Sequence, residues 1–303
     1  MCNLITCVLC NVSGLAELVS TTLRGDSSGR FKVVRCLTCG HVQLFPLPSA
    51  DEEASFYAAD GQTRGLMGEV DFSLWQSKEA ADTARRVNWL LSILPPGGEV
   101  LDVGCGYGFF VDASARAGYQ ATGLDVSRER LTLAAAYLHA TFIQGEMDDA
   151  FIAAHRNCFQ SVTLFHVLEH VCAPVTFLRQ CLELVAPGGW LLIEVPNLGD
   201  ELLDQQAQYR AFYWQRAHLS YFDSARLELA LRRAGLKDFA VRGVQRYGLR
   251  NLLHWLDESK PQLTAPAFHA TEPILVHLEQ LYWADRERAL TCDTLIAEVR
   301  KCH

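Results

Sequence analysis

The feature that most constrains the fold is a buried strand that runs into a glycine-rich turn. Residues 99–103, Glu-Val-Leu-Asp-Val, are the expected strand, and the turn that follows holds three glycines, Gly104, Gly106 and Gly108. A second expected strand, residues 120–125, ends in Asp125, about twenty residues past the turn, where a carboxylate can accept both hydroxyls of a ribose. With the expected helix at residues 109–117, this pattern predicts strands and helices alternating around a parallel sheet.

The form of the loop separates two kinds of ligand. Three glycines alone suit a dinucleotide or a tight turn equally well. Here the order D-x-G-x-G-x-G places Asp102 inside the strand and offers no spacing suited to a pyrophosphate. The loop resembles the first motif of class I S-adenosylmethionine-dependent methyltransferases, and Asp125 matches their second acid. The resemblance continues in the family's order at residues 141–147, 161–166 and 185–197.

This resemblance implies a Rossmann-like class I methyltransferase sheet with helices on both faces, and S-adenosyl-L-methionine as the cofactor. Family members hold the donor at the glycine loop and the second acid, and they position the adenine after the third strand. The residues that the resemblance implies for cofactor binding are Asp102, Gly104, Cys105, Gly106, Gly108, Asp125, Val126, Glu146, Met147, Phe165 and Tyr57.

Two cysteine pairs near the N-terminus predict a zinc site. They are Cys7-Val-Leu-Cys10 and Cys36-Leu-Thr-Cys39, and a two-residue spacer lets both thiolates of a pair point at one ion. Four thiolates complete a tetrahedral Zn²⁺ site without an open position for water, so the expected role is structural. Unrelated buried cysteines are the alternative. The remaining cysteines are scattered, and the whole pattern fits a reducing cytosol.

Composition along the chain predicts four parts. Residues 1–48 form a zinc-ribbon-like module, and 49–95 form a helical connector or lid that ends at Pro-Pro-Gly-Gly. Residues 96–245 form the Rossmann-like cofactor domain. Residues 246–303 form a helical C-terminal extension, with an amphipathic helix at about 274–289.

A short motif at the end of the fourth expected strand offers candidate catalytic residues. His166-Val-Leu-Glu169-His170 fits the H-x-x-E-H pattern of inverted zinc proteases, but many of these methyltransferases have a variant of V-L-E-H-V there and no third ligand segment is evident. Three hypotheses stay open. Glu169 and His170 cap the following helix while His166 borders the donor, or one histidine is a general base, or the segment holds a divalent metal as in quinone O-methyltransferases.

The segment at residues 213–222 suggests an acceptor class. With the two cysteine pairs, it is similar to the zinc-bearing sugar C-methyltransferases of deoxysugar pathways, and His218 and Tyr221 fit that motif. Arg216 and Ala217 replace the histidine and glutamate that serve proton abstraction in those enzymes. Losing that glutamate favours methylation of oxygen or nitrogen over carbon. His218 is then either a base or a histidine that holds the loop through one hydrogen bond.

Net charge and hydropathy limit the classes of molecule that this protein is expected to bind. A net charge of −8 gives no electrostatic reason for long contact with a phosphate backbone, so nucleic acid is not the expected partner. No stretch is long and apolar enough to cross a membrane, and the N-terminus does not have the form of a secretory signal, so a cytoplasmic location is expected. The expected substrate is a small molecule, with a sugar or nucleotide-sugar as the favoured class. An RNA methyltransferase that docks through the ribbon and a non-catalytic binding protein are the alternatives. The aromatic and arginine residues from Gln245 onward either receive the ring and phosphates of a nucleotide-linked sugar, or cover the sheet edge or form a homodimer face.

Overall fold

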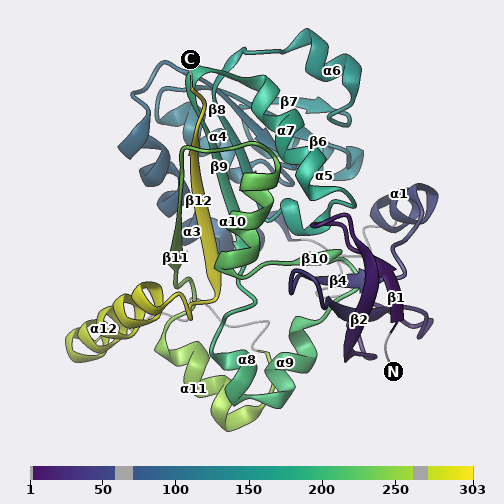
Figure 1. Cartoon of the computed structure of the whole chain (residues 1–303). Helices are drawn as coiled ribbons and strands as arrows, with labels where there is room; N and C mark the ends of the chain where they lie inside the picture. The colour runs from purple at the N-terminus through teal and green to yellow at the C-terminus, as the bar shows by residue number, and fades with distance from the viewer. Residues whose placement is uncertain (1–2, 59–70, 262–271, 303) are drawn as a thin grey trace.

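The computed structural model describes residues 3–58, 71–261 and 272–302, and within them the largest sheet has seven strands (Figure 1). Their order is β7-β6-β5-β8-β9-β12-β11, and neighbouring strands are parallel except on both sides of β12. The strands are β5 (Glu99–Val103), β6 (Gln120–Asp125), β7 (Thr141–Gln144), β8 (Phe159–Phe165), β9 (Val185–Pro196), β11 (Phe239–Val244) and β12 (Thr294–Arg300). The predicted α/β Rossmann-like sheet is confirmed.

Helices cover both faces of this sheet because successive side chains of each strand point to opposite sides. On one face Val100 packs with residues of α3 (Phe72–Ile93) and α4 (Phe109–Arg116), and α5 (Arg128–Tyr137) packs beside them. On the other face Leu101 packs with residues of α6 (Asp149–Ala154), α7 (Pro174–Leu184) and α10 (Ser224–Arg233). Neighbouring buried residues of β5 therefore contribute to two hydrophobic cores, one on each face of the sheet.

The C-terminal part of the chain differs from its prediction. Helices α11 (Leu249–Glu258) and α12 (Pro273–Ala289) agree with a helical extension. The prediction is wrong at the end, because β12 lies between β9 and β11 and pairs antiparallel with both. The run Thr-Leu-Ile-Ala-Glu-Val is rich in β-branched and apolar residues, and most of its side chains are buried in the sheet.

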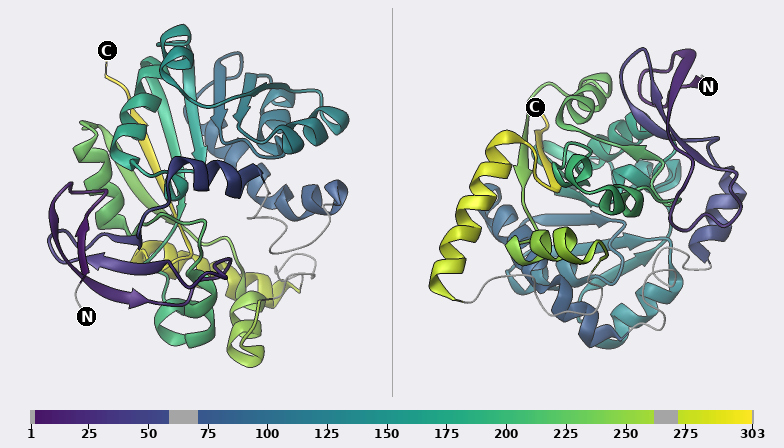
Figure 2. Two further views of the ribbon diagram at one scale, coloured as in Figure 1. Left: turned by 90° about the vertical axis from the view of Figure 1, so that its right-hand side faces the viewer. Right: turned by 90° about the horizontal axis from the view of Figure 1, so that it is seen from below.

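The N-terminal strands form a second sheet that includes a strand from the middle of the chain. Its order is β1 (Asn3–Thr6), β2 (Ser13–Ser20), β3 (Lys32–Cys36), β4 (Val42–Phe45) and β10 (Ser220–Tyr221). Figure 2 shows β1 to β4, the purple to dark blue strands of this sheet, to one side of the main sheet, next to the helix α1 (Ala50–Ala58). Because β10 pairs antiparallel with β4, the predicted module is joined to the rest of the molecule by backbone hydrogen bonds.

The short elements gather at one end of the main sheet. The 3₁₀ helix η1 (Leu168–His170) follows β8, α8 (Leu202–Gln205) and α9 (Ala207–Tyr213) follow β9, and α11 follows β11 (Figure 1). This is the carboxyl end of the parallel strands, where open α/β sheets bind ligands. No helix among the described residues is long and apolar enough to span a membrane.

Candidate active site

Two adjoining cavities open at the carboxyl ends of β5, β6 and β8, and they contain most of the predicted cofactor residues. The first has a volume of about 390 Å³, and among the residues that line it are Gly104, Asp125, Val126, Glu146 and Met147. The second has a volume of about 290 Å³, and among the residues that line it are Asp102, Gly104, Cys105, Gly106 and Phe165. Gly108 lines neither cavity, and the side chain of Tyr57 lies outside the described part of the chain.

The glycine loop has a backbone that only glycine adopts easily. Gly104, Gly106 and Gly108 have φ angles of 71°, 56° and 73°. A Cβ atom on Gly104 would lie 2.6 Å from Val167. The amide of Gly106 donates to Oδ2 of Asp125 at 2.8 Å, and the amide of Ser127 donates to Oδ1 at 2.8 Å. Both bonds hold the Asp125 carboxylate at the edge of the first cavity.

Asp102 presents a buried carboxyl group to the second cavity. Its side chain is 5% exposed, and burial raises its pKa to about 7. The Thr163 hydroxyl donates to Asp102 Oδ1 at 2.6 Å and opposes this shift. Asp102 therefore changes charge near neutral pH.

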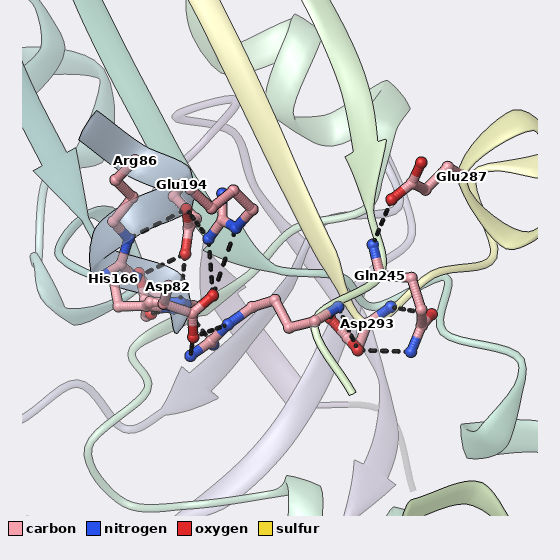
Figure 3. A network of polar contacts seen from close by, with 10 residues as sticks. Asp82, Arg86, His166, Glu194, Gln245, Glu287 and Asp293 are labelled. Atoms are coloured by element: carbon pink, nitrogen blue, oxygen red, sulfur yellow. Dashed lines mark hydrogen bonds and ion pairs between the residues drawn. The ribbon is translucent and has the colours of Figure 1, made fainter. Parts of the chain in front are cut away.

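A buried network of charges closes the site on the side of α3 and β9 (Figure 3). Glu194 of β9 is fully buried and accepts from Arg85 at 2.8 Å and from Arg86 at 2.6 Å. Although burial opposes it, Arg86 and His166 hold the pKa of Glu194 well below its usual range. Arg246 donates through two nitrogens to Asp82 of α3.

His166 sits where the network meets the cavities. It borders both cofactor cavities and a third cavity, and its φ angle of 58° lies in the left-handed region, which is uncommon for a residue with a Cβ. Nδ1 lies 3.3 Å from Glu169 and Nε2 lies 3.0 Å from Glu194. Burial and Arg246 lower the pKa of His166, but the two carboxylates outweigh them and raise it. An imidazole flanked in this way favours its charged form.

The third cavity has a volume of about 320 Å³ and aromatic walls. The walls come from α9, α11 and the segments beside them, and they include Tyr209, Phe212, Tyr213, Tyr247 and Trp255. His166, Glu169, His170 and His218 also line it. His166 and His170 line the first cavity as well, so the third cavity adjoins it.

Glu169, His170 and His218 form a compact group in this cavity. Nδ1 of His170 is 2.7 Å from the Ala217 carbonyl, which only accepts, so Nδ1 has the proton and Nε2 of the neutral ring has the lone pair. Gln215 Nε2 lies 2.7 Å from Nε2 of His218. Burial, His170 and Arg24 lower the pKa of His218 well below its usual range, so this ring is neutral.

The same group could supply ligands to a cation. One ligand atom from each of Glu169, His170 and His218 lies within 4.8 Å of the others, and Oε2 of Glu169 is buried without a hydrogen-bond partner. The metal hypothesis from the sequence involved His166, Glu169 and His170, and the structure groups His218 with the last two instead. The hypothesis that Glu169 caps the following helix differs from the structure, because its carboxylate faces His166.

Two predicted features of the 213–222 segment take other positions. Tyr221 is fully buried but lines none of these three cavities, and its hydroxyl bonds the backbone of Gln215 at 3.0 and 3.1 Å. Arg216 pairs with Glu53 of α1 at 2.6 Å and lies over the rings of Phe31 and Phe56. The structure therefore gives both residues a part in holding this segment and does not bring Tyr221 to the reacting group.

The four cysteines of the N-terminal pairs converge. Sγ atoms of Cys7 and Cys39 are 3.6 Å apart, those of Cys10 and Cys36 are 3.8 Å apart, and all four lie within 4.8 Å of one another. Metal–sulfur bonds of about 2.3 Å in a tetrahedron place sulfurs about 3.8 Å apart, so these residues fit Zn²⁺. Burial raises the pKa of the Cys7 and Cys39 thiols, whereas, against the effect of burial, backbone amides of Cys39 and Thr38 help to lower the pKa of Cys36 to about 7, so the fit to Zn²⁺ rests on the positions of the sulfur atoms.

Several residues of the site had no signal in the sequence. Arg24 reaches the third cavity from the loop after β2, and Glu194 and Asp82 form the buried network. Their positions depend on pairings between distant segments. One prediction from the sequence gives the aromatic and arginine residues near 245–256 the part of receiving a ring or phosphates. Arg246, Tyr247 and Trp255 of this segment line the third cavity.

Comparison with known proteins gives two kinds of similarity. A family model described as a methyltransferase domain matches residues 75–241. The ubiquinone biosynthesis O-methyltransferases of Albidiferax ferrireducens and Thiobacillus denitrificans are 38% and 36% identical over 120 and 117 residues, which is 37% of this chain in both cases and 47% and 50% of those proteins. The chain spans about half the length of these curated relatives.

Solved structures share the fold at low identity. A methyltransferase from Archaeoglobus fulgidus, 15% identical, has a TM-score of 0.52 over 77% of this chain and 100% of its own. The 1,6-didemethyltoxoflavin-N1-methyltransferase of Burkholderia thailandensis, solved with S-adenosylhomocysteine, is 16% identical and has a TM-score of 0.52 over 92% of this chain and 97% of its own. These likenesses concern the fold alone.

Proposed function

Because the chain belongs to the methyltransferase domain family of S-adenosylmethionine-dependent enzymes, we propose that it transfers a methyl group from S-adenosylmethionine to an oxygen of a small acceptor. The observation that supports this most is that the first cofactor cavity and the aromatic third cavity, which we take as the acceptor cavity, meet at His166 and His170. Direct displacement needs donor and acceptor aligned in this way, and such alignment supplies a large part of the rate. The cofactor supplies the electrophilic methyl group.

The donor side of the proposal uses the predicted cofactor residues. The glycine loop lets the backbone approach the cofactor, and Asp125 offers its carboxylate to the ribose hydroxyls. Asp102 offers a carboxyl to the second cavity, where the charged amino group of the donor is expected. These residues bind and orient the donor.

We assign the general base to His170. The Ala217 carbonyl fixes its tautomer so that Nε2 can accept the proton of an acceptor hydroxyl. His166 is less suited, because two carboxylates favour its charged form. His218 stays the second candidate, since Gln215 lies against one of its nitrogens.

Oxygen is the favoured atom for two reasons. Ala217 stands where the sugar C-methyltransferases have their glutamate, and Arg216, at the place of their histidine, is paired with Glu53. The segment therefore lacks the strong base that abstraction of a proton from carbon requires. The curated relatives are named O-methyltransferases. A sugar or nucleotide-sugar acceptor rests on the partial sequence motif alone.

We also propose that Zn²⁺ at the four cysteines stabilises the fold. Two arginines of α10 donate to the cysteine loops, Arg226 to the Cys39 carbonyl at 3.2 Å and Arg233 to the Cys10 carbonyl at 3.1 Å. The ion would therefore fix a surface that packs on the catalytic domain, without a direct part in methyl transfer.

Calorimetric titration of the zinc-loaded protein with S-adenosylhomocysteine tests the donor site. We expect binding that Asp125→Ala weakens by more than tenfold, because the substitution removes a carboxylate from the cavity. Asp149→Ala, at an exposed acid of α6, is the matched control and should bind as the wild type does. A folded protein that does not bind the cofactor product would contradict the proposed function.

A further inference from the structure

Arg24 is a cation of the N-terminal module that lines the acceptor cavity. It follows β2, and its backbone is fixed to the segment before β10. The Arg24 amide donates to the Trp214 carbonyl at 2.9 Å, and the Arg216 amide donates to the Arg24 carbonyl at 2.9 Å. The residue is therefore part of the cavity wall and does not belong to a free loop.

The guanidinium of Arg24 has no acidic partner among the described residues. It donates to the Gln215 side-chain oxygen at 2.6 Å and lies 4.0 Å above the ring of Phe212. It is half-buried, and burial lowers its pKa. A cation removed from water without a counter-charge carries a free-energy cost that a bound anion would relieve.

The other charged groups of this cavity already have partners. Arg246 is paired with Asp82, and Glu169 faces His166. Asp293 accepts from the Gln245 side chain at 2.6 Å and from backbone amides. Among the described residues that line this cavity, Arg24 is thus the arginine without a carboxylate partner.

We propose that Arg24 is the receptor for an anionic group, a carboxylate or phosphate, on a ring-containing acceptor; this rests on the proposed function. A guanidinium presents paired donors that match the oxygens of such groups. The aromatic walls suit the ring, and the cavity volume of about 320 Å³ is at the low end for ligand pockets, which are about 300–1,000 Å³. Such an acceptor bears its charge on the module side and its reacting hydroxyl toward His170.

Gln215 connects the proposed anion site to His218. Gln215 bridges Arg24 and His218, because its side-chain oxygen accepts from Arg24 at 2.6 Å while its nitrogen lies 2.7 Å from His218. The charge of Arg24 also lowers the pKa of His218.

Benzoate and benzamide test the anion site, since they have the same shape and differ in charge. With saturating S-adenosylhomocysteine, calorimetry or ligand-observed NMR should show that the wild type binds benzoate at least about tenfold more tightly than benzamide. Arg24→Gln should bring this ratio close to one. Arg210→Gln, at an exposed arginine of α9, is the control and should keep the wild-type ratio.

Phenyl phosphate distinguishes the two anions. Tighter binding than benzoate identifies a phosphate site and weaker binding a carboxylate site, provided that Arg24→Gln removes the preference. Equal binding of benzoate and benzamide by the wild type, or a preference that survives Arg24→Gln, overturns the proposal. The affinity for S-adenosylhomocysteine is measured separately in each variant and should not change with Arg24→Gln. If the wild type does not bind S-adenosylhomocysteine, that result counts against the proposed function and not against the anion site.

Discussion

Replacing Asp102 with asparagine tests the electrostatics of the cofactor cavity. The carboxyl is buried at the end of β5, and burial raises its pKa to about 7, compared with an ordinary value of 3.8. The folded protein therefore holds a proton that the unfolded chain releases at lower pH. Stability falls as the pH rises from about 4 to about 7, because over that range the unfolded chain binds fewer protons than the folded protein.

The size of the effect follows from the pKa difference. About three pH units at 1.36 kcal/mol each correspond to a cost on the order of 4 kcal/mol above pH 7. The asparagine side chain has no charge to bury, and it keeps the shape of the aspartate that it replaces. We expect the Asp102→Asn variant to match the wild type near pH 4 and to gain up to about 4 kcal/mol in free energy of unfolding at pH 8, measured by urea denaturation at fixed zinc.

The donor provides a second measurement of the same charge. Its amino group and sulfonium are positive, so Asp102→Asn should weaken S-adenosylmethionine binding more at pH 8 than at pH 5, where the wild-type carboxyl is protonated. Asp112→Asn, at a buried acid of α4 outside both cofactor cavities, is the control. A stability difference between Asp102→Asn and wild type that does not change between pH 4 and pH 8 would refute the assignment of a raised pKa.

Further predictions concern the zinc site, the base and the charge network. Cys36→Ser should lower the bound zinc, measured by mass spectrometry, and weaken benzoate binding more than S-adenosylhomocysteine binding; the reverse order would contradict a module that serves the acceptor side. His170→Ala should reduce kcat by about 10²- to 10⁴-fold with little change in KM for the donor. A larger loss in His218→Ala would move the base to that residue. Glu194→Gln should lower the free energy of unfolding, measured by urea denaturation, by about 3–5 kcal/mol, because Arg86 would stay buried without its charged partner. A loss below about 1 kcal/mol would show that the ion pair does not stabilise the fold.

Local patterns predicted the parts of the fold that depend on neighbouring residues. The second expected strand, 120–125, has the bounds of β6, and the expected strand at 99–103 has the bounds of β5. A short apolar run before the glycine turn marks β5, and the acid about twenty residues past that turn marks the end of β6. The cysteine pairs were predictable for a similar reason, since two-residue spacing is a property of the ligand loop itself.

The rest depends on contacts between distant segments. β12 is a short apolar run that forms a strand because it pairs with β9 on one side and β11 on the other. The preceding residues are helical, so the sequence pattern favoured a helix there. Arg24 lies in a turn-rich loop, and only the backbone pairing with residues 214–216 brings it to the cavity. Tyr221 matched a motif, but its hydroxyl is used by the backbone of Gln215, which the motif does not record.

The arrangement of the 213–222 segment explains how the proposed zinc site can matter for methyl transfer although none of its four cysteines lines the acceptor cavity. The Leu44 amide of β4 donates to the Leu219 carbonyl at 3.0 Å, and the Leu219 amide donates to the Glu169 carbonyl at 2.8 Å. The segment is thus held between the module and η1. Two residues before Leu219, the Ala217 carbonyl fixes the tautomer of His170. A shift of β4 would therefore move the carbonyl that fixes the tautomer of the proposed base, so the proposed zinc ion would act on the chemistry through backbone position.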